Sequence, residues 1–403
     1  MPEISTETMP EVSDRPPRLQ RRWPVSVRVF LACLVVIGVG SVLWVGWAIT
    51  RQEQAIQQVE SLGGHSFRGA NPLPVTWQER LGKQQADRVA RVELVDLFGK
   101  AAGDQEIAEL LGTLQDVRNL DLTKSQVTDR GLASVAGVVP LRQLALAETR
   151  VTDAGLLHLA KLAQLQILDL SGTPVTGTGL HEFAKSSGGP RLKKLLLCDC
   201  PLSDAGLAEL AGLTTLTHVD LARTPLADMH LQQVARLVLL ETLVLSDCSL
   251  TDVSLAPLAQ LPSLRKLDLS GTQITGTGLA HLKSLPWLEW LDLSSCPVDE
   301  AGLSQLGELH AFGYLGLADT PVTDAALESL RGVSAVHRLR LDNTRITDAG
   351  LPVFEKMFSL RYLSLNGTRV TPAGVARLKQ ARTDLTVVCM YTADGDTETD
   401  ADE

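Results

Sequence analysis

A motif of the form LxxLxL recurs along the chain at a nearly constant step of 24 residues. Its copies begin at Val92, Val117, Leu141, Leu165, Leu192, Leu216, Leu240, Leu264, Leu288, Phe312, Val336 and Leu360. The step from Leu165 to Leu192 is 27 residues because 185–190 (KSSGGP) lengthens one connection, and a partial copy at Leu385 closes the series. A fixed period of this length is typical of a solenoid, in which small units stack and share one continuous core. Abundant leucine and only 4% aromatic residues agree with that interpretation.

Each unit is expected to contain one strand and one helix. In the unit that starts at Leu141, the alternation of Leu141, Leu144 and Leu146 favours a short strand. Leu156 and Leu159 follow at helical spacing. Repeated strands joined by helices predict an α/β fold with a parallel sheet.

Two further positions of the unit carry polar side chains with a structural purpose. Position nine is always small and able to donate: Ser125, Thr149, Thr173, Cys200, Thr224, Cys248, Thr272, Cys296, Thr320, Thr344 and Thr368. Such a group can satisfy backbone carbonyls where the chain leaves the strand. Position twelve is Thr, Ser or Asp in every one of these units except the one with Ala227, and an acid usually follows, which indicates a helix N-cap.

The cysteines are expected to be free thiols. Cys200, Cys248 and Cys296 occupy position nine two units apart, which places them roughly 10 Å from each other at ordinary strand spacing. That separation is too long for a disulfide.

A membrane anchor is predicted before the repeats. Val29 to Ile49 contains 21 residues without a charge, enough for a helix to cross a hydrocarbon core of about 30 Å. Five arginines (Arg15, Arg18, Arg21, Arg22 and Arg28) precede this run and only Arg51 closely follows it, which predicts a cytoplasmic N-terminus and an extracytoplasmic repeat domain. A cleaved signal peptide is the alternative.

The organisation expected from these features has six parts. They are a disordered cytoplasmic tail (1–24), the transmembrane anchor (25–50), a juxtamembrane stalk and joint (51–74), an N-terminal cap (75–91), the repeats (92–390) and an acidic disordered tail (391–403). The acidic tail contributes six of the charges behind the formal net charge of -10. With a pI of about 5.4 and no basic stripe, nucleic-acid binding is not expected.

The repeats resemble the leucine-rich-repeat superfamily through LRKLDLSGTQITGTGLAHL and LRLDNTRITDAGL. The resemblance is nearest to the cysteine-containing type of ribonuclease-inhibitor-like and F-box proteins. No F-box precedes the repeats, and with its anchor the chain looks more like membrane-anchored bacterial proteins of this superfamily. The resemblance implies an α/β leucine-rich-repeat solenoid, a curved horseshoe with parallel strands on the concave face and short helices on the convex face, preceded by one transmembrane helix. It also implies protein recognition by the concave face.

Strand alternation sends positions three and five of each unit to the concave face. Position three of the C-terminal units holds the candidate partner-binding residues Lys266, Trp290, Tyr314, Arg338 and Tyr362, and His337, Arg340 and Arg361 lie beside them. Trp, Tyr and Arg are the usual anchors of interfaces, so this surface is predicted to hold an acidic or aromatic peptide segment.

Other functions remain as alternatives or are not expected. Trp290, Tyr314 and Tyr362 could instead stack on the rings of a glycan, and a reversed topology would favour a cytoplasmic adaptor. The aspartates at position five, including Asp268 and Asp292, are interpreted as solvated structural residues. No HExxH, GxSxG or CxxC motif occurs, and we expect no catalytic residue, metal or cofactor.

Overall fold

A computed structural model of the chain describes residues 36, 39, 47, 49–69, 92–114, 116–185, 191–306, 313–332 and 335–390. The chain separates into two units, Met1–Arg51 and Gln52–Glu403. In the first unit the described residues are helical, and the Arg51 guanidinium lies 4.7 Å from the centre of the Trp47 ring. Within these ranges no helix has both the length and the apolar character needed to cross a bilayer. Most of the expected anchor, both expected tails and the expected cap at 75–91 lie outside the described residues.

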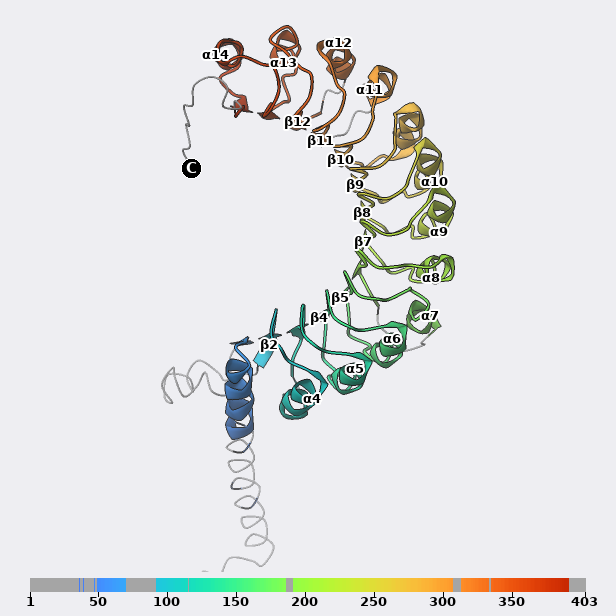
Figure 1. Cartoon of the computed structure of the whole chain (residues 1–403), viewed down its shortest axis with the longest axis vertical. Coiled ribbons are helices and arrows are strands. Elements are labelled where there is room, and N and C mark those ends of the chain that lie inside the picture. The colour runs from blue at the N-terminus through green and yellow to red at the C-terminus, as the bar shows by residue number, and fades with distance from the viewer. Residues whose placement is uncertain are drawn as a thin grey trace, which may run out of the picture. The chain divides into compact units, whose positions relative to one another are not determined.

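The described part of the second unit contains one 14-stranded sheet whose strands follow the sequence order (Figure 1). The strands are β1 (His65–Arg68), β2 (Val92–Asp96), β3 (Asn119–Asp121), β4 (Gln143–Ala145), β5 (Ile167–Asp169), β6 (Lys194–Leu196), β7 (His218–Asp220), β8 (Thr242–Val244), β9 (Lys266–Asp268), β10 (Trp290–Asp292), β11 (Tyr314–Gly316), β12 (Arg338–Arg340), β13 (Tyr362–Ser364) and β14 (Thr386–Val388). β1 and β2 are antiparallel, and every later pair is parallel and in register. Residues at one position of successive units therefore lie side by side.

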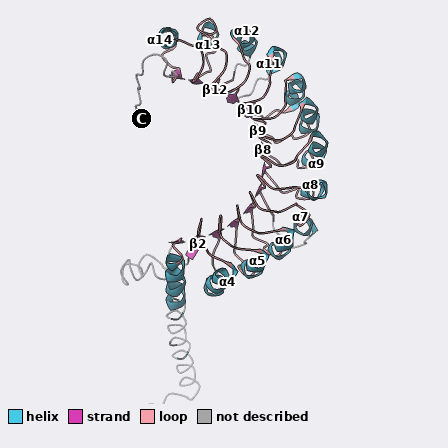
Figure 2. Ribbon diagram, viewed as in Figure 1, coloured by secondary structure: helices cyan, strands magenta, loops and turns pink. Residues whose placement is uncertain are grey.

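Helices connect the strands on the opposite side of the core, and within this unit the strands line the inner side of the curve (Figure 2). They are α4 (Asp104–Thr113), α5 (Asp129–Val135), α6 (Asp153–Leu159), α7 (Leu180–Lys185), α8 (Asp204–Leu210), η1 (Asp228–His230), α9 (Leu231–Val234), η2 (Asp252–Ser254), α10 (Leu255–Leu258), η3 (Thr277–Ser284), α11 (Glu300–Leu306), α12 (Asp324–Leu327), η4 (Glu328–Gly332), α13 (Pro352–Glu355) and α14 (Pro372–Ala381). The η elements are 3-10 helices, so several units carry a tighter connection than the α-helix predicted from spacing. Leu144, Leu146, Leu156 and Leu159 are buried between the two layers, as predicted.

The N-terminal end of the repeat core is closed by a segment that the sequence suggested was a stalk. Residues 52–61 are helical, and Ala55 and Val59, four residues apart on one helical face, are fully buried in the core. Gly63 then takes a φ of +77°, which turns the chain into β1. Residues 52–69 therefore cover the apolar end of the first repeat, which would otherwise face water.

Position nine behaves as predicted. The Thr149 hydroxyl donates to the Leu146 carbonyl at 2.7 Å, while the Cys200 thiol reaches back to the Leu170 carbonyl of the preceding unit at 3.1 Å. The cysteines that the structure describes (Cys198, Cys200, Cys248, Cys296 and Cys389) are free, which confirms that part of the prediction. Among the described side chains, the buried Ser125 hydroxyl departs from the pattern because it has no partner.

Position twelve caps its helix and also joins neighbouring units. Thr152 accepts a hydrogen bond from the Ala154 N–H, as expected for an N-cap. Its own N–H and hydroxyl donate to the Asp129 carboxylate at 2.7 and 2.6 Å. Asp129, the acid that follows the cap Thr128, therefore receives the cap of the next unit. The same contact recurs for Thr128, Thr176, Thr251, Thr275, Thr347 and Thr371.

The unit that has Ala227 at position twelve uses a histidine instead. His230 Nδ1 accepts from the Ala227 N–H at 3.0 Å, and His230 Nε2 lies 3.1 Å from the Asp204 carboxylate. Because Nδ1 accepts, the ring proton must be on Nε2, which then donates to Asp204. The imidazole thus replaces the missing threonine in the contact between units.

Position eight of each unit adopts the left-handed backbone conformation, whatever its side chain. The residues are Gly99, Lys124, Glu148, Gly172, Asp199, Arg223, Asp247, Gly271, Ser295, Asp319, Asn343 and Gly367, with φ between +54° and +69°. The turn after the strand requires this conformation, which costs roughly 1 kcal/mol or more for an ordinary side chain. The stacked core therefore outweighs the local preference of Lys124 or Glu148.

Candidate functional site

The predicted residues at position three form consecutive rungs of the sheet. Lys266 pairs with Trp290, Trp290 with Tyr314, Tyr314 with Arg338, and Arg338 with Tyr362. Trp290 and Tyr314 are half-buried, whereas Arg338 is exposed and Tyr362 is 39% exposed. We call the side chains of Lys266, Trp290, Tyr314, Arg338, Arg340 and Tyr362 the C-terminal concave surface.

The two largest rings of this surface stack on each other. The centroids of Trp290 and Tyr314 are 4.7 Å apart and the ring planes differ by 8°. The Lys266 Nζ lies 4.1 Å from the centre of the Trp290 ring. Because β9 and β11 flank β10 on opposite sides, Lys266 and Tyr314 cover opposite faces of the indole. A ligand on this surface therefore meets the edge of Trp290 and not its face.

Tyr314 is fixed by an aspartate beneath the aromatic pair. Its hydroxyl donates to Asp292 Oδ2 at 3.1 Å, and the Ser294 N–H donates to Asp292 Oδ1 at 2.9 Å. Burial, followed by the charge of Asp292, raises the pKa of Tyr314 to about 12. Asp292 is buried with 8% exposure, so the expectation of a solvated acid was wrong at this position. Its structural role is to orient the phenol.

A second buried aspartate holds Arg340. Arg340 Nε donates to Asp342 Oδ2 at 2.6 Å, and Asp342 Oδ1 accepts from the Ser364 hydroxyl at 2.5 Å and from the Asn366 N–H at 2.9 Å. Burial raises the pKa of Asp342, but the hydrogen bonds from Ser364 and Arg340 outweigh it and lower that pKa. Arg340 remains 52% exposed and can donate outward from a fixed position. Sequence reasoning missed Asp342, although an acid at position seven beside Arg340 was a visible signal.

The other predicted cations divide into free and occupied groups. Among the described residues, no partner of the Arg338 guanidinium is found. Arg361 donates to the Phe358 carbonyl at 2.6 Å and lies 3.1 Å from Asp384, so its charge is already partnered. His337 and Arg361 precede their strands, at the flank of the sheet, and the structure does not bring them into the concave surface.

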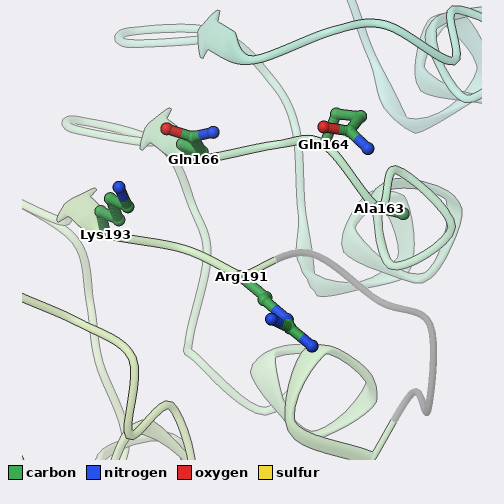
Figure 3. Close-up of a pocket in the computed structure, with 5 residues that line it drawn as sticks. All are labelled: Ala163, Gln164, Gln166, Arg191 and Lys193. Atoms are coloured by element: carbon green, nitrogen blue, oxygen red, sulfur yellow. The ribbon is translucent and has the colours of Figure 1, made fainter.

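A hollow of about 310 Å³ lies elsewhere, before β5 and β6, and is lined by Ala163, Gln164, Gln166, Arg191 and Lys193 (Figure 3). It occurs at the unit of 27 residues, which is three residues longer than the common step of 24. Figure 3 shows Arg191 and Lys193 pointing in different directions, so the two charges do not converge. Among the described residues, no carboxylate, histidine or cysteine lines it. Nor does the described part of the chain contain a group of three His, Cys, Asp or Glu residues placed to hold a metal ion.

Comparison with known proteins supports the fold. Residues 238–298 match the family described as leucine rich repeat. A crystal structure of an internalin from Listeria monocytogenes is similar with a TM-score of 0.54 and 20% identity, over 76% of this chain and 91% of that chain. The structure of a leucine-rich-repeat protein from Leptospira interrogans has a TM-score of 0.42 and 18% identity, over 70% of this chain and 80% of that chain. No curated protein matches.

The family match, the likeness to the internalin and the parallel sheet with alternating helices support a leucine-rich-repeat solenoid. At 20% identity the likeness to the internalin speaks for the fold alone. The cysteine-containing subtype stays a prediction.

Proposed function

We propose that the chain is a membrane-anchored scaffold that binds a protein segment on its C-terminal concave surface. The observation that carries this proposal is the pair of guanidinium groups that β12 presents on the concave side of the sheet. Arg338 is exposed and has no partner among the described residues, and Arg340 is held at Asp342 while half of its side chain faces solvent. Preorganised donors lose little freedom when a ligand binds, which favours affinity. Leucine-rich-repeat domains commonly serve as protein-binding scaffolds of this kind.

The chemistry of this surface favours an acidic segment. Arg338 and Arg340 lie two residues apart on β12, so both point to the concave side about 6.7 Å apart. An extended peptide with carboxylates at alternate residues has the same spacing and can form charge-assisted hydrogen bonds with both guanidinium groups. Tyr362 adds an exposed ring beside them for an aromatic residue of the same segment.

Glycan binding is less well supported than peptide binding. A sugar would need an open ring face, and both faces of Trp290 are covered by Lys266 and Tyr314. Tyr362 is the exposed aromatic ring that remains in the surface.

The surface can be tested by selecting binders from a library of short random peptides with the full-length protein in detergent. We expect enrichment of acidic residues, and binding that weakens as salt is added. Arg338→Ala and Tyr362→Ala should each reduce the affinity of the selected peptides by about tenfold. Gln143→Ala is the matched control, because Gln143 is exposed at the same position of an N-terminal unit. Enrichment without acidic residues, or equal effects of all three substitutions, would contradict the proposed surface.

The proposed topology places residues 29–49 in the membrane and the repeats outside the cytoplasm. The asymmetry of arginines around the apolar run supports this orientation. Protease added to intact cells, after any outer layer is permeabilised, should digest the repeats of a C-terminally tagged protein. Protection until the cells are lysed would reverse the topology and favour a cytoplasmic adaptor.

A further inference from the structure

The last residues of the sequence carry acidic side chains at a regular spacing. Residues 391–403 read YTADGDTETDADE and contain no basic residue. Five of the six acids fall on every second position, at Asp394, Asp396, Glu398, Asp400 and Asp402, and Glu403 follows directly. In an extended backbone, alternate side chains point to the same side at intervals of about 6.7 Å. This segment can therefore present five carboxylates along one side.

The final units of the solenoid carry the complementary charge. Arg338, Arg345 and Arg369 are exposed, and no ion pair or side-chain hydrogen bond joins them to any described residue. Arg345 and Arg369 occupy position ten of consecutive units and so lie on neighbouring rungs. By contrast, Arg377 and Arg382 of the same region are paired with Asp348 and Asp384. We call Arg338, Arg345 and Arg369 the C-terminal arginines.

The described chain ends against the turn that precedes Arg369. The Met390 N–H donates to the Asn366 side chain at 2.7 Å, and the Gly367 N–H donates to the Met390 carbonyl at 3.5 Å. Met390 thus extends the series of turns that follows the strands. β12 is two strand spacings from β14, or about 10 Å, and an extended chain covers that distance in about three residues. Asp394 comes four residues after Met390 and can reach the nearest of the arginines.

We propose that residues 394–403 bind the C-terminal arginines of their own chain and compete there with an acidic partner. The competition rests on the proposed function of the concave surface, since both ligands would use Arg338. Each exposed ion pair is weak, but attachment to the same chain gives the segment a high effective concentration. The contact is therefore strong enough to reduce partner binding and weak enough for a partner to displace it.

The test compares the native full-length chain with a tail-neutralised chain that carries Asp394→Asn, Asp396→Asn, Glu398→Gln, Asp400→Asn and Asp402→Asn. The probe is a fluorescein-labelled synthetic peptide of residues 391–403, and its binding is followed by fluorescence anisotropy. The tail-neutralised chain should bind the probe about three- to tenfold more tightly than the native chain, because no attached competitor remains. A peptide of equal composition with its acids in one contiguous block should bind less well.

Substitution of the arginines identifies the site. The double substitution Arg345→Ala and Arg369→Ala should lower the affinity of the tail-neutralised chain for the probe. It should also reduce the difference in affinity between the tail-neutralised and native chains. Arg150→Ala is the control, because Arg150 is exposed at position ten of a distant unit and should change nothing. Equal binding to native and tail-neutralised chains, or no binding to either, would overturn the tail contact.

The library selection described above separates this failure from failure of the proposed function. If selected acidic peptides still depend on Arg338 while the tail probe fails, the concave surface stands and the tail contact falls. If the native protein displaces the labelled probe from the tail-neutralised chain more strongly as the native concentration rises, its tail binds other molecules. That result would refute a contact within one chain.

Discussion

Arg382 is a buried side chain that should hold the last unit of the solenoid in place. It follows α14 and is 6% exposed. Its guanidinium donates to the carbonyls of Phe354 at 3.0 Å, Met357 at 2.9 Å and Leu360 at 2.9 Å. Phe354 belongs to α13, and Met357 and Leu360 lie between α13 and β13, so one side chain joins the end of α14 to the preceding unit.

The expected cost of Arg382→Ala follows from what the substitution leaves behind. The Asp384 carboxylate is 50% exposed and regains water, so it does not become an unpaired buried charge. Three hydrogen bonds from the guanidinium to these carbonyls are lost, at about 1 kcal/mol each. The total is about 3 kcal/mol, at the lower end of the cost of breaking a fully buried ion pair.

Because contacts in a solenoid are made between neighbouring units, the loss should be local. Hydrogen exchange followed by mass spectrometry should show amides of α14 exchanging about 100-fold faster in Arg382→Ala, while amides of the central units stay unchanged. The control Arg377→Ala removes an exposed ion pair of 3.4 Å from the same helix and should cost about 0.5 kcal/mol or less. Unchanged exchange in α14, or an increase spread evenly along the chain, would refute the reasoning.

Three further substitutions test other contacts of the fold. Ser295→Gly should raise the free energy of unfolding in urea by about 0.5–1 kcal/mol, because Ser295 has a φ of +59° that glycine adopts without strain. His230→Ala should lower it by about 2 kcal/mol, because the partly buried Ala227 N–H loses its acceptor, and adding Ala227→Thr should recover part of that loss. Burial raises the pKa of Asp153, but hydrogen bonds from the next unit outweigh burial and lower that pKa below 3.8. The stability that results is present above pH 3.8 and is lost as the pH falls through the pKa of Asp153 in the folded protein. Asp153→Asn should therefore flatten the acid limb of a plot of stability against pH.

Each of these outcomes has a clear opposite. A loss of stability in Ser295→Gly would mean that the serine makes contacts worth more than its backbone strain. Failure of Ala227→Thr to help His230→Ala would show that imidazole and threonine are not equivalent in the contact between units. An unchanged acid limb in Asp153→Asn would assign the acid sensitivity to other carboxylates.

The interior of the solenoid was predictable because its residues repeat with a fixed chemical type. Leu144 and Leu146 belong to a pattern that only a stacked strand satisfies, and Thr149 or Cys200 at position nine could be assigned to a backbone carbonyl. The left-handed turn at position eight was not visible, because Lys124 and Glu148 are residues that avoid this conformation when alone. At these positions the free energy gained by packing the core exceeds the cost of the unfavourable backbone conformation.

The candidate surface was predictable in its membership but not in its arrangement. The period identifies Trp290 and Tyr314 as neighbours, yet spacing does not state that the rings stack and that Lys266 covers the remaining face. The cap at 52–61 was missed although Ala55 and Val59 share a helical face, because the predicted anchor beside it favoured a stalk. The contact between Thr152 and Asp129 was missed too, although the period places this threonine about one unit after that acid.

The in-register pairing of the sheet determines how a chain of this kind can change in length. Since Trp290 pairs with Tyr314 one unit later, a gene duplication or deletion of one whole unit would leave the neighbouring pairs aligned. A gain or loss of a partial unit would shift every later side chain out of line. The longer unit between Leu165 and Leu192 avoids that outcome because its additional residues lie in the connection before β6, outside the paired strands. Evolution can thus move a binding surface along the solenoid, or add another, in whole-unit steps.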